Sequence, residues 1–146
     1  MIYSMTFCVE PVEQARPRAT RFGKGIRLYD PKKVAEYKEN LAYLAKFQFR
    51  HKPISKPLKI EIKFYRGLQK SISKKERIKR LSHVHRPIVK PDLDNYIKST
   101  LDALNGIIWA DDNLIVDLTA HKFYSDKPRI ELEVEEYDTH KKTSDC

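Results

Sequence analysis

The sequence has 146 residues, 40% of them hydrophobic, and a net charge of +9. This length suits one domain, and the hydrophobic fraction predicts a packed core rather than a disordered chain. No run of about 18 apolar residues occurs, so we expect no membrane span and no membrane partner. The first residues, "MIYSMTFCVEPVEQ", contain too short an apolar stretch for a secretory signal, because acidic residues follow it early. The expected location is therefore the cytoplasm.

The charge is distributed unevenly along the chain. Residues 1–90 contain 23 basic and 7 acidic side chains, a net charge of +16, whereas residues 91–146 carry −7. A strongly basic half favours a polyanionic partner, most simply nucleic acid. The alternative is a solvated surface that only keeps the protein in solution.

The first part of the chain predicts a strand, a loop and a helix. Residues 2–10 are rich in β-branched and aromatic side chains and predict a strand that buries Cys8. Residues 11–25 contain Pro, Gly and basic residues and predict a mobile loop. A helix follows, with Asp30 as its cap and Pro31 in its first turn. Its buried stripe is expected to consist of Val34, Tyr37, Leu41, Leu44 and Ala45.

The remaining elements complete an α+β pattern. Residues 57–66 alternate cleanly and predict a half-buried strand, and residues 70–81 predict a short basic helix or helical turn. After a connection at 82–91, a helix at 94–105 precedes strands at 114–124 and 129–136. The order is β-α-β-(α)-α-β-β, a mixed β-sheet packed by two main helices. We expect one domain over residues 1–137 and a disordered tail over 138–146.

The helix at 94–105 combines an apolar stripe with acidic residues. Asp94 and Asp102 lie one turn to either side of Lys98 on one edge of the helix. Asp92 is expected to precede the helix in an extended conformation, so that its side chain converges with that of Asp94 at the N-terminus. Asn105 and Gly106 end the helix. The stripe that enters the core is expected to be Leu93, Ile97, Leu101 and Leu104.

Acidic residues are concentrated around this helix. Segment 91–117 holds six aspartates and one lysine, including Asp111 and Asp112 in "WADDN". Clustered carboxylates repel one another unless a cation neutralises them, and hard oxygen ligands suit Mg²⁺ or Mn²⁺. A carboxylate-bound metal beside a basic surface is suited to phosphodiester hydrolysis. The alternative is that these acids are helix caps and surface ion pairs.

The stretch "KPDLDNYIKSTLDALNGIIWADD" resembles the signature of the RusA family of Holliday junction resolvases. The shared pattern is acid-x-acid-Asn, a lysine four residues after the second acid, then "DAL" and "W-x-D-D". The upstream segments "PVEQARPR" and "FYRGLQKSISKKER" are also similar to the family, and the resemblance covers roughly residues 5–136.

The resemblance implies an activity and the residues that carry it. The family's essential carboxylates match Asp92, Asp94 and Asp112, and its essential lysine matches Lys98; Asp111 is adjacent and can substitute or assist. Members are Mg²⁺-dependent homodimers, with Mn²⁺ as a substitute, that nick both sides of a four-way DNA junction. The products carry 5′-phosphate and 3′-hydroxyl ends, in recombination and repair. A bacterial or prophage-encoded, nucleoid-associated protein is implied.

The basic half then has a role in gripping phosphates. The residues expected to bind DNA are Arg16, Arg18, Arg21, Lys24, Lys70, Lys74, Lys75, Lys79 and Arg80. Trp109 is expected to pack in the core rather than stack on DNA. Two alternatives remain open at this stage: a non-catalytic module that binds branched DNA, and a nuclease that prefers flaps or forks.

Overall fold

The computed structural model describes residues 1–137, so the tail expected at 138–146 lies outside it. Within the described residues no helix is long and apolar enough to cross a membrane. The elements, in chain order, are β1 (Ile2–Phe7), β2 (Arg18–Phe22), β3 (Gly25–Tyr29), α1 (Lys32–Gln48), β4 (Leu58–Arg66), α2 (Lys74–Leu81), α3 (Leu93–Leu104), the short 3₁₀ helix η1 (Asp112–Leu114), β5 (Ile115–Tyr124) and β6 (Arg129–Glu136).

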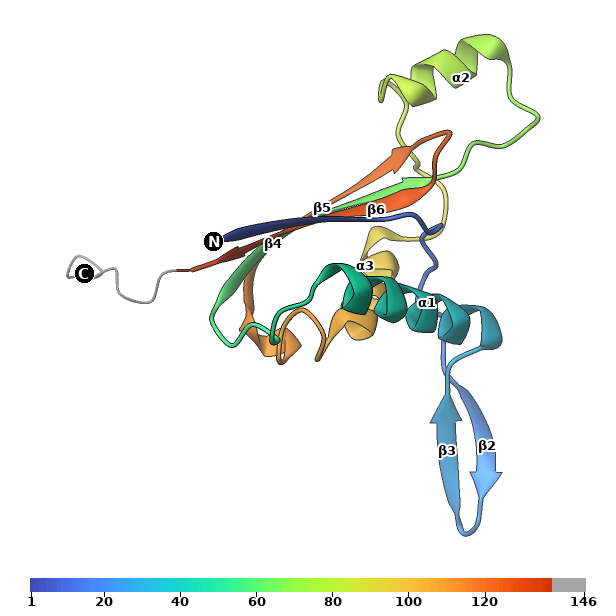
Figure 1. Cartoon of the computed structure of the whole chain (residues 1–146). Helices are drawn as coiled ribbons and strands as arrows, with labels where there is room; N and C mark the ends of the chain where they lie inside the picture. The colour runs from blue at the N-terminus through green and yellow to red at the C-terminus, as the bar shows by residue number, and fades with distance from the viewer. Residues whose placement is uncertain (138–146) are drawn as a thin grey trace, which may run out of the picture.

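Four strands form one mixed sheet in the order β1-β6-β4-β5. Strand β4 runs parallel to β5 and antiparallel to β6, and β6 is antiparallel to β1. Helices α1 and α3 cover one face of this sheet (Figure 1). The predicted strand at 57–66 is confirmed, and Ile60, Ile62 and Phe64 point from it into the core. The α+β class and the order of the main elements are therefore confirmed.

Helix α1 buries most of its predicted stripe. Val34, Tyr37, Leu41 and Ala45 are buried, and Leu44 is half-buried. The prediction that Asp30 caps this helix is wrong, because Pro31 occupies the cap position and no side chain caps the helix. The carboxylate of Asp30 instead accepts hydrogen bonds from Lys38 Nζ (2.8 Å) and Gln14 Nε2 (3.0 Å). The bond to the lysine pairs two opposite charges, which a cap bond to a backbone N–H does not.

The predicted core stripe of α3 is only partly correct. Leu104 is buried, whereas the other three members, Leu93, Ile97 and Leu101, are partly buried against the core. The face that is fully inside the protein contains Tyr96, Ser99, Thr100, Ala103 and Leu104.

Hydrogen bonds explain why two hydroxyl residues of α3 occupy the core. The Tyr37 hydroxyl and Thr100 Oγ1 are 2.8 Å apart, which joins α1 to α3. Ser99 Oγ donates to the carbonyl of Val12 at 2.6 Å. A buried hydroxyl is tolerated once it has a partner, but that partner comes from a distant segment. An apolar stripe read along the helix does not include such residues.

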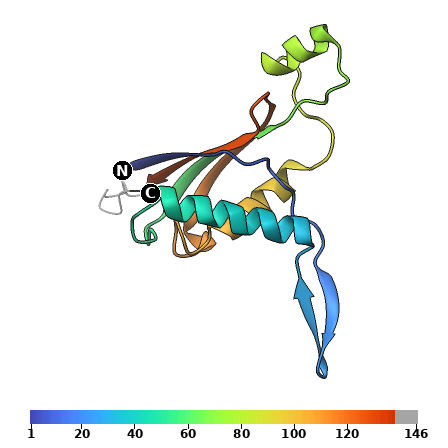
Figure 2. The ribbon, with the colours of Figure 1, turned by 45° about the vertical axis from the view of Figure 1, so that its right-hand side comes forward.

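The predicted loop at 11–25 is wrong over its second half, where the chain forms the β2–β3 hairpin. Gly23, with φ +58°, opens its two-residue turn, as type II′ turns require. The hairpin projects away from the sheet and helices (Figures 1 and 2). Every residue of both strands is exposed. Its apolar alternation is limited to Ile26 and Leu28 in β3, a run too short to predict strands from the sequence.

Two smaller expectations concern Cys8 and residues 70–81. Cys8 is exposed rather than buried, because Met5 and Phe7 are the residues of this segment that face the core and the next residue lies on the opposite side. The short basic helix is confirmed as α2, capped by Ser73, whose side chain accepts from the backbone N–H of Glu76 at 3.1 Å. Helix α2 buries none of its residues and stands beyond one end of the sheet (Figure 1).

Candidate active site and nucleic-acid interface

Asp92 and Asp94 lie at the start of α3, as predicted. Asp92 occupies the N-cap position with an extended backbone (φ −68°, ψ 145°), and its side chain makes no cap hydrogen bond. In the described part of the chain, Asp94 accepts only from the backbone N–H of the next residue, Asn95, at 3.0 Å. Both carboxylates are exposed, and among residues 1–137 neither forms an ion pair. Their oxygens are therefore available to a ligand.

Two cations of the sheet fix the backbone just before these acids. Lys122 Nζ on β5 donates to the carbonyls of Pro91 (3.0 Å) and Val89 (3.3 Å). Arg66 at the end of β4 donates to the carbonyl of Lys90 at 3.0 Å. These three bonds hold residues 89–91 against the sheet, so they set where Asp92 lies.

Asp112 is positioned by the core. Trp109 is fully buried, as expected, and its Nε1 donates to Asp112 Oδ1 at 2.6 Å. This bond leaves Oδ2 of Asp112 free of any protein hydrogen bond in the described residues. The side chain of Asp111 has a different role: it caps η1 by accepting a hydrogen bond from the backbone N–H of Asn113 at 3.2 Å.

Electrostatics place Asp112 among other charged groups. Partial burial raises the pKa of Asp112, and the hydrogen bond from Trp109 opposes that rise. The carboxylates of Asp102 and Asp111 raise the same pKa further, while the ammonium of Lys98 lowers it. The negative charges of Asp102 and Asp111 disfavour the ionised form of Asp112. A bound cation would offset this repulsion and favour the ionised carboxylate.

Asp102 is a member of this group that the sequence did not single out as a site residue. Its carboxylate lies 4.0 Å from Lys98 Nζ and 3.5 Å from Lys38 Nζ. The i, i+4 spacing identifies the first contact. The second joins α1 to α3 across 64 residues, and no local pattern indicates it.

Replacing Lys38 with methionine is expected to destabilise the fold by about 1–2 kcal/mol, because Asp30 and Asp102 lose a shared, partly buried cation. Lys38 lowers the pKa of Asp30 below its usual value of 3.8. That contribution is therefore present above pH 3.8 and lost as the pH falls further. Urea unfolding at neutral and acid pH tests this. Lys33→Met, on the exposed side of α1, is the control, and equal losses for both variants would contradict the prediction.

The site acids form two groups rather than one. Asp92 and Asp94 lie at the start of α3, whereas Asp111 and Asp112 begin η1, beyond the end of that helix. Among the described residues, no three Asp, Glu, His or Cys side chains are grouped so that they could hold one metal ion. The donor chemistry suits Mg²⁺, but the carboxylates of a single chain do not converge on one point.

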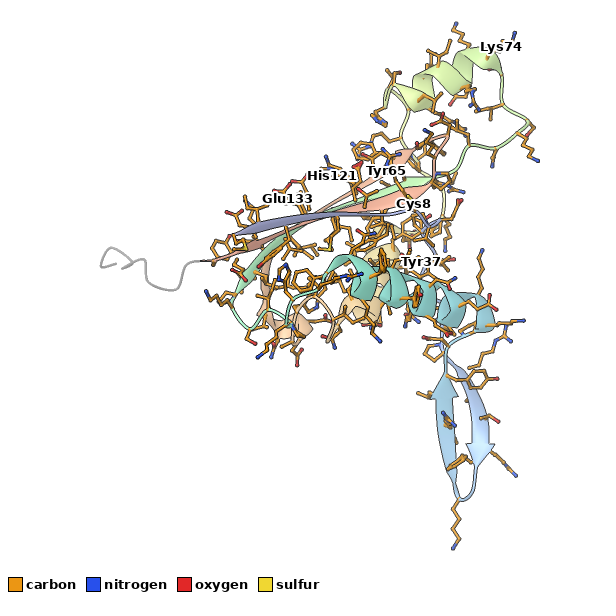
Figure 3. All side chains as sticks on the ribbon, in the orientation of Figure 1. Cys8, Tyr37, Tyr65, Lys74, His121 and Glu133 are labelled. Carbon is orange, nitrogen blue, oxygen red and sulfur yellow. The ribbon has the colours of Figure 1, made fainter. Side chains whose placement is uncertain are left out.

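The basic residues are divided between two projections. Arg16, Arg18, Arg21 and Lys24 are exposed on or beside the β2–β3 hairpin. Lys70, Lys74 and Lys75 are exposed at the other projection, where Lys74 marks the start of α2 (Figure 3). Arg80 is bound to Glu76 at 2.8 Å and stacks on Tyr124, and Lys79 is half-buried. The start of α3 lies between the two projections (Figures 1 and 2).

Fold and site together define a basic α+β protein with exposed carboxylates between two cationic projections, a combination suited to acting on nucleic acid. Residues 9–135 match the family described as Endodeoxyribonuclease RusA. The chain is also 40% identical over 132 residues to "Uncharacterized protein YqaN" of Bacillus subtilis (strain 168), which covers 87% of this chain and 91% of that protein. The chain belongs to the RusA family of endodeoxyribonucleases.

Proposed function

We propose that this protein is a metal-dependent endonuclease that resolves four-way DNA junctions by paired nicks, leaving 5′-phosphate and 3′-hydroxyl ends, in recombination and repair of bacterial or prophage DNA. The observation that carries the proposal is the pair Asp92 and Asp94. Their carboxylates are exposed and free of ion pairs within the described residues, and they lie between two basic projections. Family membership supports the nuclease class.

The proposed ligands of Mg²⁺, or of Mn²⁺ in its place, are Asp92, Asp94 and Asp112. The cation, when bound, supplies polarisation of the scissile phosphate and charge stabilisation for the leaving oxygen. Asp112 is favoured over Asp111 as the third ligand, because Asp112 Oδ2 is free whereas Asp111 caps η1. Lys98, largely exposed and one turn beyond Asp94, offsets negative charge on the reacting phosphate.

A homodimer is proposed to complete the site. Within residues 1–137, strand β5 pairs only with β4 and its other edge is open, and Val116 and Leu118 on this strand are exposed. Helix α3 runs antiparallel to β5. Pro91, just before the start of α3, accepts a hydrogen bond from Lys122 near the end of the strand, and the last turn of α3 leads through η1 to the beginning of the strand. If two β5 edges pair antiparallel about a two-fold axis, Asp112 of one protomer approaches the partner's Asp92 and the partner's Asp94.

The substrate is tested by comparing a four-way junction with a flap and a fork at equal salt. We expect Mg²⁺-dependent nicks at symmetrical positions in the junction, at least about tenfold faster than cleavage of the flap. Cleavage of the flap at an equal or higher rate would contradict junction resolution and support the flap or fork nuclease. Tight junction binding without cleavage in Mg²⁺ or Mn²⁺ would support the non-catalytic binding module.

A further inference from the structure

The β2–β3 hairpin is an element without a packing partner in the described part of the chain. Every residue of its two five-residue strands is exposed, and it stands clear of the body in both ribbon views (Figures 1 and 2). An isolated two-stranded hairpin is at best marginally stable in water. Its strands therefore gain stability when another molecule covers them.

The charge of the hairpin selects the class of that molecule. Residues 16–29 contain five basic side chains and no acidic one. Such a segment attracts a polyanion, whereas the same charge repels a second hairpin brought up across a two-fold axis. A two-stranded ribbon also fits within the major groove of DNA. Nucleic acid is therefore favoured over a second copy of the chain.

One face of the hairpin combines arginines with an isolated aromatic ring. The pairs Arg18–Tyr29, Thr20–Arg27 and Phe22–Gly25 share this face. Phe22 lies beside the turn, is 70% exposed and pairs with a glycine, so no cross-strand side chain packs on its ring. Exposed aromatic rings beside cations are typical of surfaces that stack on bases and contact phosphates.

The base of the hairpin is tied to the candidate active site. The backbone N–H of Gln14 donates to the carbonyl of Asn95, next to Asp94, at 2.9 Å. The side chain of Gln14 also donates to Asp30, which directly follows β3, at 3.0 Å. Five strand residues span about 17 Å. Phe22 is therefore held roughly one hairpin length from the acids of α3.

We propose that this hairpin enters the branch point of DNA, where Phe22 stacks on an unstacked base and Arg18 and Arg27 contact the flanking phosphates. The inference rests on the proposed function in taking branched DNA as the substrate. Bases at a branch point cost less to unstack than bases inside a duplex. Phe22 therefore favours branched over continuous DNA, whereas phosphate contacts bind both.

The test is binding in EDTA, measured by fluorescence anisotropy against salt for a four-way junction and a duplex of the same sequence. Phe22→Ala is expected to weaken junction binding about 5- to 150-fold. Duplex binding should change less than about twofold, and the slope of log affinity against log salt should stay the same. Arg27→Ala should weaken both complexes and reduce that slope by about 0.9. Phe22→Trp should retain junction binding.

Tyr43→Ala, which removes an exposed aromatic ring from α1, is the matched control and should leave binding unchanged. Equal weakening of junction and duplex by Phe22→Ala, or no weakening, would overturn the inference. Sedimentation of the free Phe22→Ala variant is a further check. If this replacement dissociates the protein into smaller species, the hairpin is a contact between copies and the inference is overturned. Nicking is assayed separately with Mg²⁺. If the wild-type protein never nicks, the proposed nuclease function is wrong. If its preference for junctions nevertheless depends on Phe22, the hairpin inference is still supported.

Discussion

Replacing Asp92 with asparagine is expected to slow Mg²⁺-dependent nicking of a four-way junction by about a thousandfold or more. Asparagine keeps the size and the N-cap preference of aspartate, so α3 should still start at Leu93. What is lost is the charge that holds a cation. Because the basic projections are untouched, junction binding in EDTA should stay within about twofold of wild type.

The matched control for this variant is Asp126→Asn, which neutralises an exposed aspartate in the β5–β6 turn. It should nick at the wild-type rate. The informative measurements are single-turnover nicking and Mn²⁺ binding, since only the second reports directly on the ligand. If Asp92→Asn nicks as fast as the control, Asp92 is not a ligand and the acids at the start of α3 are helix-terminal charges only.

Mixing two inactive variants is expected to restore cleavage. Asp92→Asn and Asp112→Asn should each be inactive as homodimers. If a site takes Asp92 from one protomer and Asp112 from the other, a mixed dimer holds one site with both replacements and one intact site. Random assembly then recovers about a quarter of the wild-type sites, visible as unpaired nicks and as Mn²⁺ binding. The expectation follows from the finding that, among the described residues of one chain, no three acids are grouped to hold a metal ion.

The reciprocal mixture sharpens this experiment. A chain with both replacements, combined with wild-type chain, should form mixed dimers in which neither site is intact. If each chain instead holds a whole site, the first mixture stays inactive and the second keeps one working site per mixed dimer. Leu118→Arg, placed on the open β5 edge, should yield monomers that bind DNA but not Mn²⁺. Monomers that still bind Mn²⁺ would contradict the shared site.

The sequence predicted the main elements because local patterns determine them. Alternation revealed β4, and the capped, periodic segment revealed α3 with Asp92 held extended before it. The burial of Trp109 followed from its size. Its hydrogen bond to Asp112 did not, although both residues lie in the same short motif, because the bond depends on the turn that η1 makes.

Features that depend on distant contacts were not predictable. Ser99 and Thr100 are buried because α1 and the segment before the hairpin supply their hydrogen-bond partners. The hairpin has no buried face within the described residues, and its apolar alternation covers only Ile26 and Leu28. The aspartates of segment 91–117 were expected to share a cation because they are close in sequence, but within the described residues no three of them are grouped to hold one.

The contact between Trp109 and Asp112 has a practical consequence. The chain contains a single tryptophan, and its indole N–H is bonded directly to a proposed ligand. Indole emission responds to the polarity and charge around the ring, so the protein contains its own optical reporter at this carboxylate. Cation titration, proton titration and subunit exchange can therefore be followed at this position without attaching a dye to the chain.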